Sequence, residues 1–261
     1  MLAQKYEYSA VARGTLGYED YCSLRHEVFC TELQRVPPCE RASGDRPMES
    51  DGFDEHSVHV LCRSIATGEA VGCARLILPG PQGLNVLSRY RLHTDVTPDA
   101  ESLGEIGRLA ISSQLRRYRR NTQPVDSALP ADRAEDPRRE VKRDGPTVAL
   151  GLYREIFRLA SEHGITHCYA AMEPSLSRML NRLGFPFQEA GPINHAVQPA
   201  RQPYLIGAHA MRSGLRGRNS CLYRFIFGID EPATKSSEAS WSTQGARTAV
   251  FPMGALIPAL A

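Results

Sequence analysis

The 261-residue sequence lacks several features that would assign a class at once. It has no C-x-x-C pair and an odd number of cysteines, seven, so neither a zinc site nor a disulfide framework is indicated. No run approaches the roughly 18 apolar residues that span a bilayer, and the N-terminus lacks the pattern of a secretory signal. A net charge of +2 does not by itself indicate nucleic acid as a partner. We expect a soluble, cytoplasmic protein without a metal site or stable membrane insertion.

The sequence does contain an alternation of strand-like and helix-like apolar runs. Strands are expected at 5–12, 57–64, 69–78, 103–112, 166–173 and 221–229. Helices are expected at 15–33, 147–164 and 174–185, with 34–56 and 186–220 as loops. This order predicts a mixed α/β fold around one sheet. A doubly wound nucleotide fold is not expected, because no G-x-G-x-x-G or P-loop follows a strand.

One domain is expected over residues 1–229. It carries an arginine- and proline-rich insert at 114–146. The tail, 230–261, is rich in serine, alanine and threonine, and we expect it to be disordered.

Four clusters hold the residues that could carry chemistry. They are LRHEVF with Arg25 and Phe29, MESDGFDEH with Glu49, Asp51, Phe53 and Asp54, GCARLIL with Arg75, and LGEIGRLAIS with Glu105 and Arg108. Arg75 and Glu105 lie in runs that should be buried on at least one face, and a buried charge must be paired or hydrogen-bonded. The two charges predict a polar site within the sheet. The alternative is a sheet with one face in solvent, on which the side chains of Arg75 and Glu105 would both be hydrated.

The run 103–112 has an irregular apolar phase. Three of its apolar residues share one strand phase and Ile106 has the other, so the phase slips near Gly107. One extra residue at a glycine forms a β-bulge. A bulge would turn Glu105 and Arg108 toward one site and leave a backbone N–H free, as a thioester carbonyl gaining negative charge requires. The alternative is a glycine that only fits a bend.

Taken in order, the four clusters resemble the pattern of acyl-homoserine-lactone (autoinducer) synthases and of N-acyl amino acid synthases, both in the GNAT superfamily. The long inserts and the wording R-H-x-V-F-C-x-E are most similar to bacterial acyltransferases associated with exosortase and PEP-CTERM protein sorting. The resemblance covers residues 18–112, and extends to about residue 229 through element order. It implies a GNAT-like fold, with a central, mostly antiparallel sheet flanked by helices and splayed between two strands. An acyl thioester would enter that cleft, and the activity would be N-acyl transfer to a small amine, an amino acid or similar.

The resemblance also implies roles for individual residues. The catalytic group would be Glu105, Arg108 and Asp54, and the substrate-binding group Arg25, Asp51, Arg75, Phe29 and Phe53. Glu105 would take the amine proton, directly or through water. If Glu105 is structural, His56 beside Asp54 is the alternative base. Cys73 and Cys168 are expected to be core residues, because no neighbouring group in the sequence lowers their pKa.

Two departures from the pattern concern the substrates. The stretch ELQRV lacks the tryptophan that usually follows the first helix, which weakens the case for S-adenosylmethionine as acceptor. REVKRDGPT replaces the GNAT pyrophosphate loop, so the expected donor is a 4′-phosphopantetheine thioester on acyl carrier protein, with acyl-coenzyme A less favoured. Arg116, Arg117, Arg119 and Arg120 would dock the acidic carrier protein at the cleft mouth, unless they form only a solvated loop. An acyl-coenzyme-A-dependent GNAT and a non-catalytic acyl-binding protein are the alternative functions.

Overall fold

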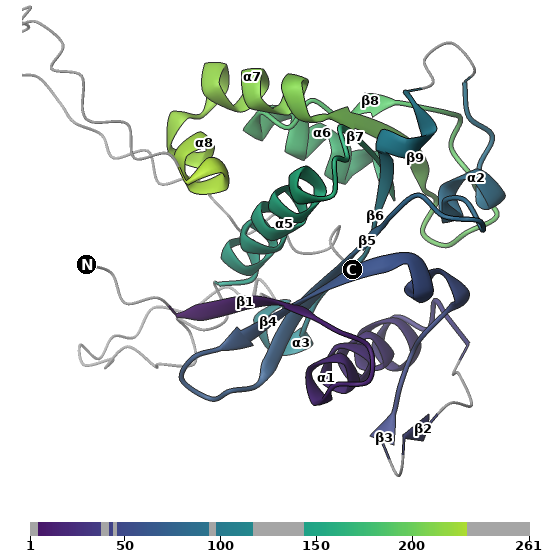
Figure 1. Ribbon diagram of the computed structural model, residues 1–261, viewed down its shortest axis with the longest axis vertical. Coiled ribbons are helices and arrows are strands. Elements are labelled where there is room, and N and C mark those ends of the chain that lie inside the picture. The colour runs from purple at the N-terminus through teal and green to yellow at the C-terminus, as the bar shows by residue number, and fades with distance from the viewer. Residues whose placement is uncertain (1–4, 38–41, 44–45, 94–97, 117–143, 229–261) are drawn as a thin grey trace, which may run out of the picture.

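The computed structural model describes residues 5–37, 42–43, 46–93, 98–116 and 144–228. Its centre is a seven-stranded sheet of order β1-β4-β5-β6-β7-β9-β8 (Figure 1). The strands are β1 (Tyr6–Val11), β4 (Ser57–Ser64), β5 (Ala70–Ile77), β6 (Leu103–Ile111), β7 (His167–Met172), β8 (Gln188–Glu189) and β9 (Gln202–Gly207). Neighbouring strands are antiparallel except for β6 and β7, which are parallel. The predicted mixed α/β fold with a mostly antiparallel sheet is confirmed.

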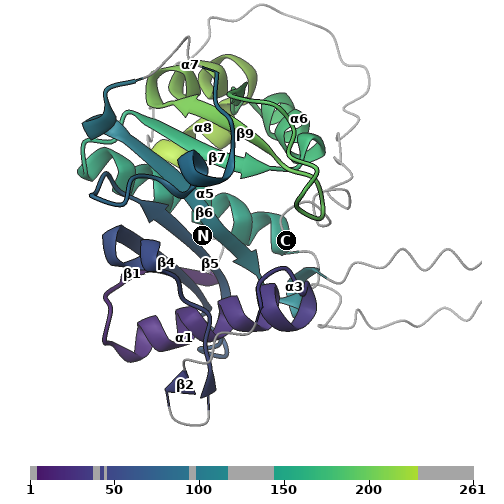
Figure 2. The ribbon, with the colours of Figure 1, turned by 90° about the vertical axis from the view of Figure 1, so that its right-hand side faces the viewer.

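Helices cover both faces of this sheet (Figures 1 and 2). One face carries α1 (Leu16–Arg25), its π-helical continuation (His26–Glu32), a 3-10 helix (Gly52–His56) and α2 (Asn85–Arg89). The other carries α5 (Gly145–Glu162), α6 (Pro174–Leu183), α7 (Ala208–Arg218) and α8 (Ser220–Phe227). The remaining short elements are β2 (Ala42–Ser43), β3 (Arg46–Pro47), a 3-10 turn (Ala100–Ser102) and α3 (Ser113–Arg116).

Alternation along β5 shows how the sheet separates two apolar layers. Ala74 and Leu76 belong to the large core beneath α5, whereas Cys73 packs with the α1 layer and Ile77 with the layer of α2. All four side chains are fully buried. Because both faces are covered, a charged residue such as Arg75 on this strand has to find its partners inside the protein.

The central sheet is interrupted between β6 and β7. Their register runs from Leu103–His167 to Ile106–Ala170 and then stops, although β6 continues to Ile111 and β7 to Met172. The backbone of residues 107–109 therefore has no ladder partner on β7. The predicted splay between two central strands is confirmed, and it lies at the carboxyl ends of both.

The C-terminal part of the domain differs from the prediction. Residues 221–229 were expected as a strand, but Ser220–Phe227 form α8, with Asn219 as N-cap and Gly228 in the left-handed conformation as C-cap. The aromatic residues of this run favour strands, but Leu222, Tyr223 and Ile226 share one helical face and pack into the core beneath α5. The strand at this edge of the sheet is instead β9, within the stretch expected to be loop, and α7 follows it.

The other elements lie within a few residues of their expected positions. Thr15 caps α1 as predicted, and Gly184 ends α6. The long first helix continues as a π-helix from His26, and the loop 34–56 contains short strands and a 3-10 helix. None of the helices in the described ranges has the length and apolarity of a membrane span. Residues 117–143 of the insert and the tail from 229 lie outside the described residues, so the predictions made for them stay predictions.

Candidate active site

The bulge expected near Gly107 is present, with Arg108 as its extra residue. Cys73 pairs with Ala110 and Arg75 with Gly107, so Ala74 opposes two residues of β6. Arg108 has a φ of 48°, in the left-handed region that favours glycine. The bulge turns the Arg108 side chain to the α1 face of the sheet, which Glu105 also faces. The predicted bulge is confirmed, but the unusual backbone conformation belongs to the arginine and not to the glycine.

Six charged side chains on this face form a closed ring, which we call the charge ring. Going round it, the residues are Arg25, Glu49, Arg108, Asp51, Arg75 and Asp54. Each carboxylate accepts hydrogen bonds from two arginines, and each arginine donates to two carboxylates. Donor–acceptor separations in the ring include 2.6 Å for Arg75 Nη1–Asp51 Oδ1 and 3.3 Å for Arg108 Nε–Glu49 Oε1. With three positive and three negative groups, the ring is neutral.

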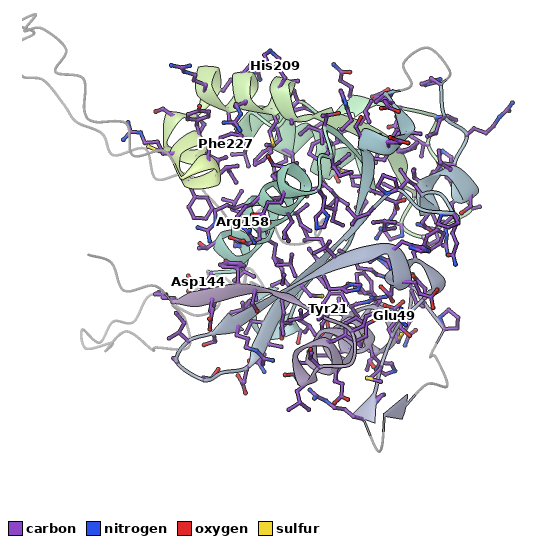
Figure 3. The ribbon with its side chains drawn as sticks, in the orientation of Figure 1. Tyr21, Glu49, Asp144, Arg158, His209 and Phe227 are labelled. Atoms are coloured by element: carbon purple, nitrogen blue, oxygen red, sulfur yellow. The ribbon has the colours of Figure 1, made fainter. Side chains whose placement is uncertain are left out.

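Local structure explains why the three carboxylates meet. Asp51 caps the 3-10 helix Gly52–His56 by accepting from the Phe53 N–H, and the Asp54 side chain accepts from the Asp51 N–H at 2.8 Å. This reciprocal capping fixes both aspartates on one turn. The Glu49 N–H donates to the Cys22 carbonyl on α1 at 3.1 Å, which places its carboxylate beside Arg25. Figure 3 shows Glu49 and Tyr21 lying close to α1, below the sheet.

The charge ring is almost completely removed from water. Arg25, Glu49, Asp54 and Arg75 are each at most 2% exposed, while Asp51 and Arg108 retain some access. Burial raises the pKa of Glu49, but Arg25 and Arg108 more than offset this and hold it below its ordinary value. The pKa of Asp54 is held low in the same way by Arg25 and Arg75. All three carboxylates are therefore ionised at neutral pH, and the ring is stable as an array of compensated charges.

His59 lies next to the charge ring, beside Asp54 and Tyr21, but does not belong to it. Its ring contacts Tyr21 with centroids 4.9 Å apart, and its Nε2 is 3.2 Å from the Asp54 carbonyl oxygen. Burial lowers the pKa of His59 to about 4, so the imidazole is neutral at pH 7. Three buried nitrogen atoms here have no hydrogen-bond partner within the described residues: Arg25 Nη2, Arg75 Nε and His59 Nδ1.

Glu105 stands apart from the ring. Its carboxylate accepts from the Val86 N–H at 2.7 Å and from Asn85 Nδ2 at 3.2 Å. Burial raises the pKa of Glu105, although these hydrogen bonds and the charges of Arg75 and Arg108 oppose the shift. A carboxyl group with a raised pKa is suited to accept a proton. Its polar partners come from α2, which the sequence prediction had not identified as a helix.

A pocket of about 100 Å³ lies in the gap where β6 and β7 separate. Its wall includes Gly107, Arg108 and Leu109 of β6, Ala171 and Met172 of β7, Tyr153 of α5 and Phe29 of the π-helix. The Arg108 guanidinium lies over the Phe29 ring, 5.6 Å from its centroid. Apolar groups on the α5 side and charged groups on the α1 side therefore meet at the gap.

The structure brings most, but not all, of the predicted site residues together. Arg25, Asp51, Asp54, Arg75 and Arg108 form the charge ring, and Phe29 lines the pocket. Phe53 instead packs with Ile77 and Leu84 in a separate apolar cluster, and Glu105 is not among the residues that line the pocket. The side chains of Arg116, Arg117, Arg119 and Arg120 lie outside the described residues. Cys73 and Cys168 are core residues as predicted, and burial raises the pKa of each thiol to about 12.

Three further charged residues belong to this region and had no predicted role. Glu49 was named in its sequence cluster but was given no role. Its position in the pattern E-x-D-x-x-D was the feature of the sequence that could have indicated one. Glu173 and Arg201 line the pocket from the end of β7 and the start of β9. No local motif marks either residue, and β9 had been expected as loop, so the sequence carried no signal for them.

Comparison with known proteins agrees with this description. Residues 24–123 match the family described as acetyltransferase (GNAT) domain, and no curated protein matches the chain. Among solved structures, the AHL synthase LasI aligns with a TM-score of 0.54 at 18% identity, over 80% of this chain and 96% of LasI. BjaI, a CoA-dependent acyl-homoserine lactone synthase solved with MTA, aligns with a TM-score of 0.55 at 18% identity, over 87% and 90% of the two chains. FeeM, an N-acyl amino acid synthase from uncultured soil microbes, aligns with a TM-score of 0.51 at 16% identity, over 85% and 98%.

At these identities the structural likeness shows a shared fold. The matched residues 24–123 include the last two residues of α1, the six residues of the charge ring and the bulged strand β6. The domain match and the splayed sheet agree with the resemblance found in the sequence. Residues 24–123 therefore match an acetyltransferase (GNAT) domain, and the chain as a whole has a GNAT-like fold.

Proposed function

We propose that the protein transfers a fatty acyl group from a pantetheine thioester to the amine of a small acceptor. The observation that carries this proposal is the gap between β6 and β7, which opens beside the bulge at Arg108 and joins an apolar wall to a polar one. An extended thioester arm fits between separated strands, because the free backbone there can bond it as a missing strand would.

The chemistry we assign to the site is direct acyl transfer. The amine nitrogen attacks the thioester carbonyl, the N–C bond forms, the C–S bond breaks, and the pantetheine thiol leaves with a proton. We assign the stabilisation of the negative charge on the carbonyl oxygen to backbone groups of residues 107–109, which have no ladder partner on β7. Glu105 is our candidate base, with water carrying the amine proton to it, because its carboxylate does not line the pocket. The charge ring keeps the bulge in place.

Acyl carrier protein is the donor that we favour over coenzyme A. Asp144 precedes the first residue of α5, and its carboxylate accepts from the Tyr6 hydroxyl at 2.9 Å. Figure 3 shows Asp144 at this end of α5, next to β1. Lys5 Nζ lies 3.5 Å from this carboxylate, but a carboxylate held at the helix N-terminus still competes with the diphosphate that GNAT proteins bind there. The basic residues Arg116, Arg117, Arg119 and Arg120 would attract the acidic carrier protein instead. Changing these four to glutamate should weaken carrier-protein binding with a strong salt dependence, and unchanged binding would exclude that docking surface.

The experiment that tests the function offers the purified full-length protein a long-chain acyl carrier protein or acyl-coenzyme A with a pool of amines. Mass spectrometry then detects N-acyl products. We expect an N-acyl product and a higher rate with the carrier protein. Faster turnover of acyl-coenzyme A would reverse the donor assignment, and binding of acyl chains without any product would indicate a non-catalytic acyl-binding protein.

In the same assay Glu105→Gln should reduce kcat by 10²-fold or more with little change in KM, and wild-type behaviour would exclude Glu105 as the base.

The biological setting is proposed from the sequence resemblance. We propose a cytoplasmic role in a bacterial exosortase and PEP-CTERM sorting system, with a lipid product that associates with the membrane. Genes for exosortase components beside the gene for this protein would support that setting.

A further inference from the structure

Arg201 occupies a position that the acyl transfer described above does not use. It directly precedes β9, and its backbone is bridged to Asn194 in both directions, by N–H···O contacts of 2.7 and 3.2 Å. Its side chain is half-buried and lines the pocket between β6 and β7. In the described ranges, no hydrogen bond or ion pair satisfies its guanidinium group. A rigidly held, partly desolvated arginine without an anion is a ready site for one.

The charges around Arg201 leave a positive excess on this side of the pocket. The charge ring is neutral in itself. Glu173, which also lines the pocket, has Arg35 3.8 Å away, and its charge acts on Arg201 as well. Burial lowers the pKa of Arg201, and the nearby charge of Arg108 adds to this effect. Among the described residues, Arg35 and Arg201 face the one carboxylate of Glu173 here, so positive groups outnumber negative ones by one.

The position of Arg201 favours the acceptor over the donor as the source of the anion. Tyr153 and Leu176 line the pocket from the α5 side and form the apolar route for an acyl-pantetheine arm. Arg201 lies close enough to three ionisable side chains, Arg108, Glu173 and Tyr90, for them to influence its pKa. We therefore assign this polar side of the pocket to the acceptor.

Resting on the proposed function, we propose that Arg201 binds the carboxylate of an amino acid acceptor, and that Glu173, across the same pocket, receives its ammonium group. A guanidinium and a carboxylate that line one pocket without pairing with each other complement a zwitterion. The acceptor class is thus a free α-amino acid, whereas a simple amine or an amino acid amide lacks the group that Arg201 requires.

Direct binding to the full-length protein tests this proposal without depending on turnover. The probes are individual amino acids, their carboxamides and their N-acetyl derivatives, measured by saturation-transfer NMR and calorimetry. We expect at least one amino acid to bind 10- to 100-fold more tightly than its carboxamide, as the loss of a charge-assisted hydrogen bond implies. Arg201→Gln should remove that difference, Arg201→Lys should restore part of it, and Arg178→Gln, at an exposed arginine on α6, should keep it. Glu173→Gln should weaken binding of the amino acid but not of its N-acetyl derivative.

Kinetics then separate this proposal from the function on which it rests. In the acyl-transfer assay Arg201→Gln should raise KM for the amino acid and leave KM for the donor unchanged. A raised donor KM would instead assign Arg201 to the phosphate of the donor and overturn the proposal. Equal binding of acids and carboxamides, or no binding of either, would also overturn it. If amino acids bind with the expected preference but no N-acyl product forms, the proposed function fails while the carboxylate site stands.

Discussion

Arg108 Nη2 lies 3.0 Å from Oε1 of Glu49, a residue 59 positions earlier in the chain. The contact exists because Arg108 adopts a left-handed backbone conformation at the bulge, with φ at 48°. A non-glycine residue in that region costs on the order of 1–3 kcal/mol and persists only where its surroundings compensate. Here the compensation comes from Glu49 and Asp51. The charge ring and the bulge therefore maintain each other, and the bulge shapes the pocket.

Replacing Arg108 by glycine or by alanine tests the backbone part of this relationship. Both changes remove the guanidinium group, and they differ in whether a Cβ occupies a position of positive φ. We expect Arg108→Gly to be about 1 kcal/mol more stable than Arg108→Ala, the reverse of the usual order in strands. Urea denaturation of the two variants measures the difference. A more stable alanine variant would show that Arg108 carries no backbone strain.

Removing one carboxylate from the charge ring should cost far more than breaking a surface ion pair. Glu49→Gln leaves Arg25, which is fully buried, with one charged partner fewer, so we expect a loss of about 3–5 kcal/mol in the free energy of unfolding. The matched control is Asp20→Asn, because Asp20 also bridges two arginines but is partly exposed. That control should lose less than about 1 kcal/mol. Similar losses in the two variants would contradict a buried ring.

The buried His59 predicts a pH dependence of stability. The unfolded chain protonates this histidine near pH 6.5, whereas the folded protein does so only near its lowered pKa of about 4. The free energy of unfolding should therefore fall as the pH drops from 6.5 to 4, with His59 contributing about 3 kcal/mol to that fall. The free energy of unfolding of wild type and of His59→Gln is measured across this pH range. Glu105 and the other titrating groups are present in both proteins, so the difference between the two curves gives the contribution of His59. Parallel curves for the two proteins would show that His59 is not buried in its neutral form.

Filling the pocket should abolish acyl transfer without unfolding the protein. Ala171 lines the pocket from β7, where the wall encloses about 100 Å³, so a tryptophan there would occupy the space for substrate. We expect Ala171→Trp to retain a cooperative thermal transition and to lose at least 10²-fold in kcat/KM. Ala66→Trp, in the exposed turn between β4 and β5, is the control for adding an indole. Full activity in Ala171→Trp would place the reaction elsewhere.

Much of the fold could be predicted because its strands and helices have strong local patterns. The hairpin at 57–78 and the helix 147–164 follow the periodicity of their apolar residues. The C-terminal residues could not be assigned in this way. The aromatic run at 221–227 favours a strand, but its packing against α5 makes it a helix, and the short run at 202–207 is a strand because β7 offers an open edge. Both outcomes depend on tertiary contacts, which single-sequence patterns do not contain.

Only those residues of the candidate site that belong to a recognisable sequence cluster could be predicted. Arg75 and Glu105 were identifiable because charges within apolar runs need partners. The acidic cluster and Arg108 were identified through the resemblance to the synthase pattern. That the six groups close into a ring depends on the bulge at Arg108, and that Glu105 lies outside it depends on contacts from Asn85 and Val86. Arg201 and Glu173 reach the pocket from the ends of strands, so only the assembled sheet reveals them.

The central claim is that the gap between β6 and β7 receives the thioester arm. A crystal structure of the protein with a non-hydrolysable acyl-pantetheine thioether tests it most directly. We expect the arm between residues 107–109 and 171–172, with its carbonyl oxygen toward the bulge and its acyl chain on the apolar side. An arm bound outside this gap, or an occupied structure in which β6 and β7 pair along their full length, would contradict it.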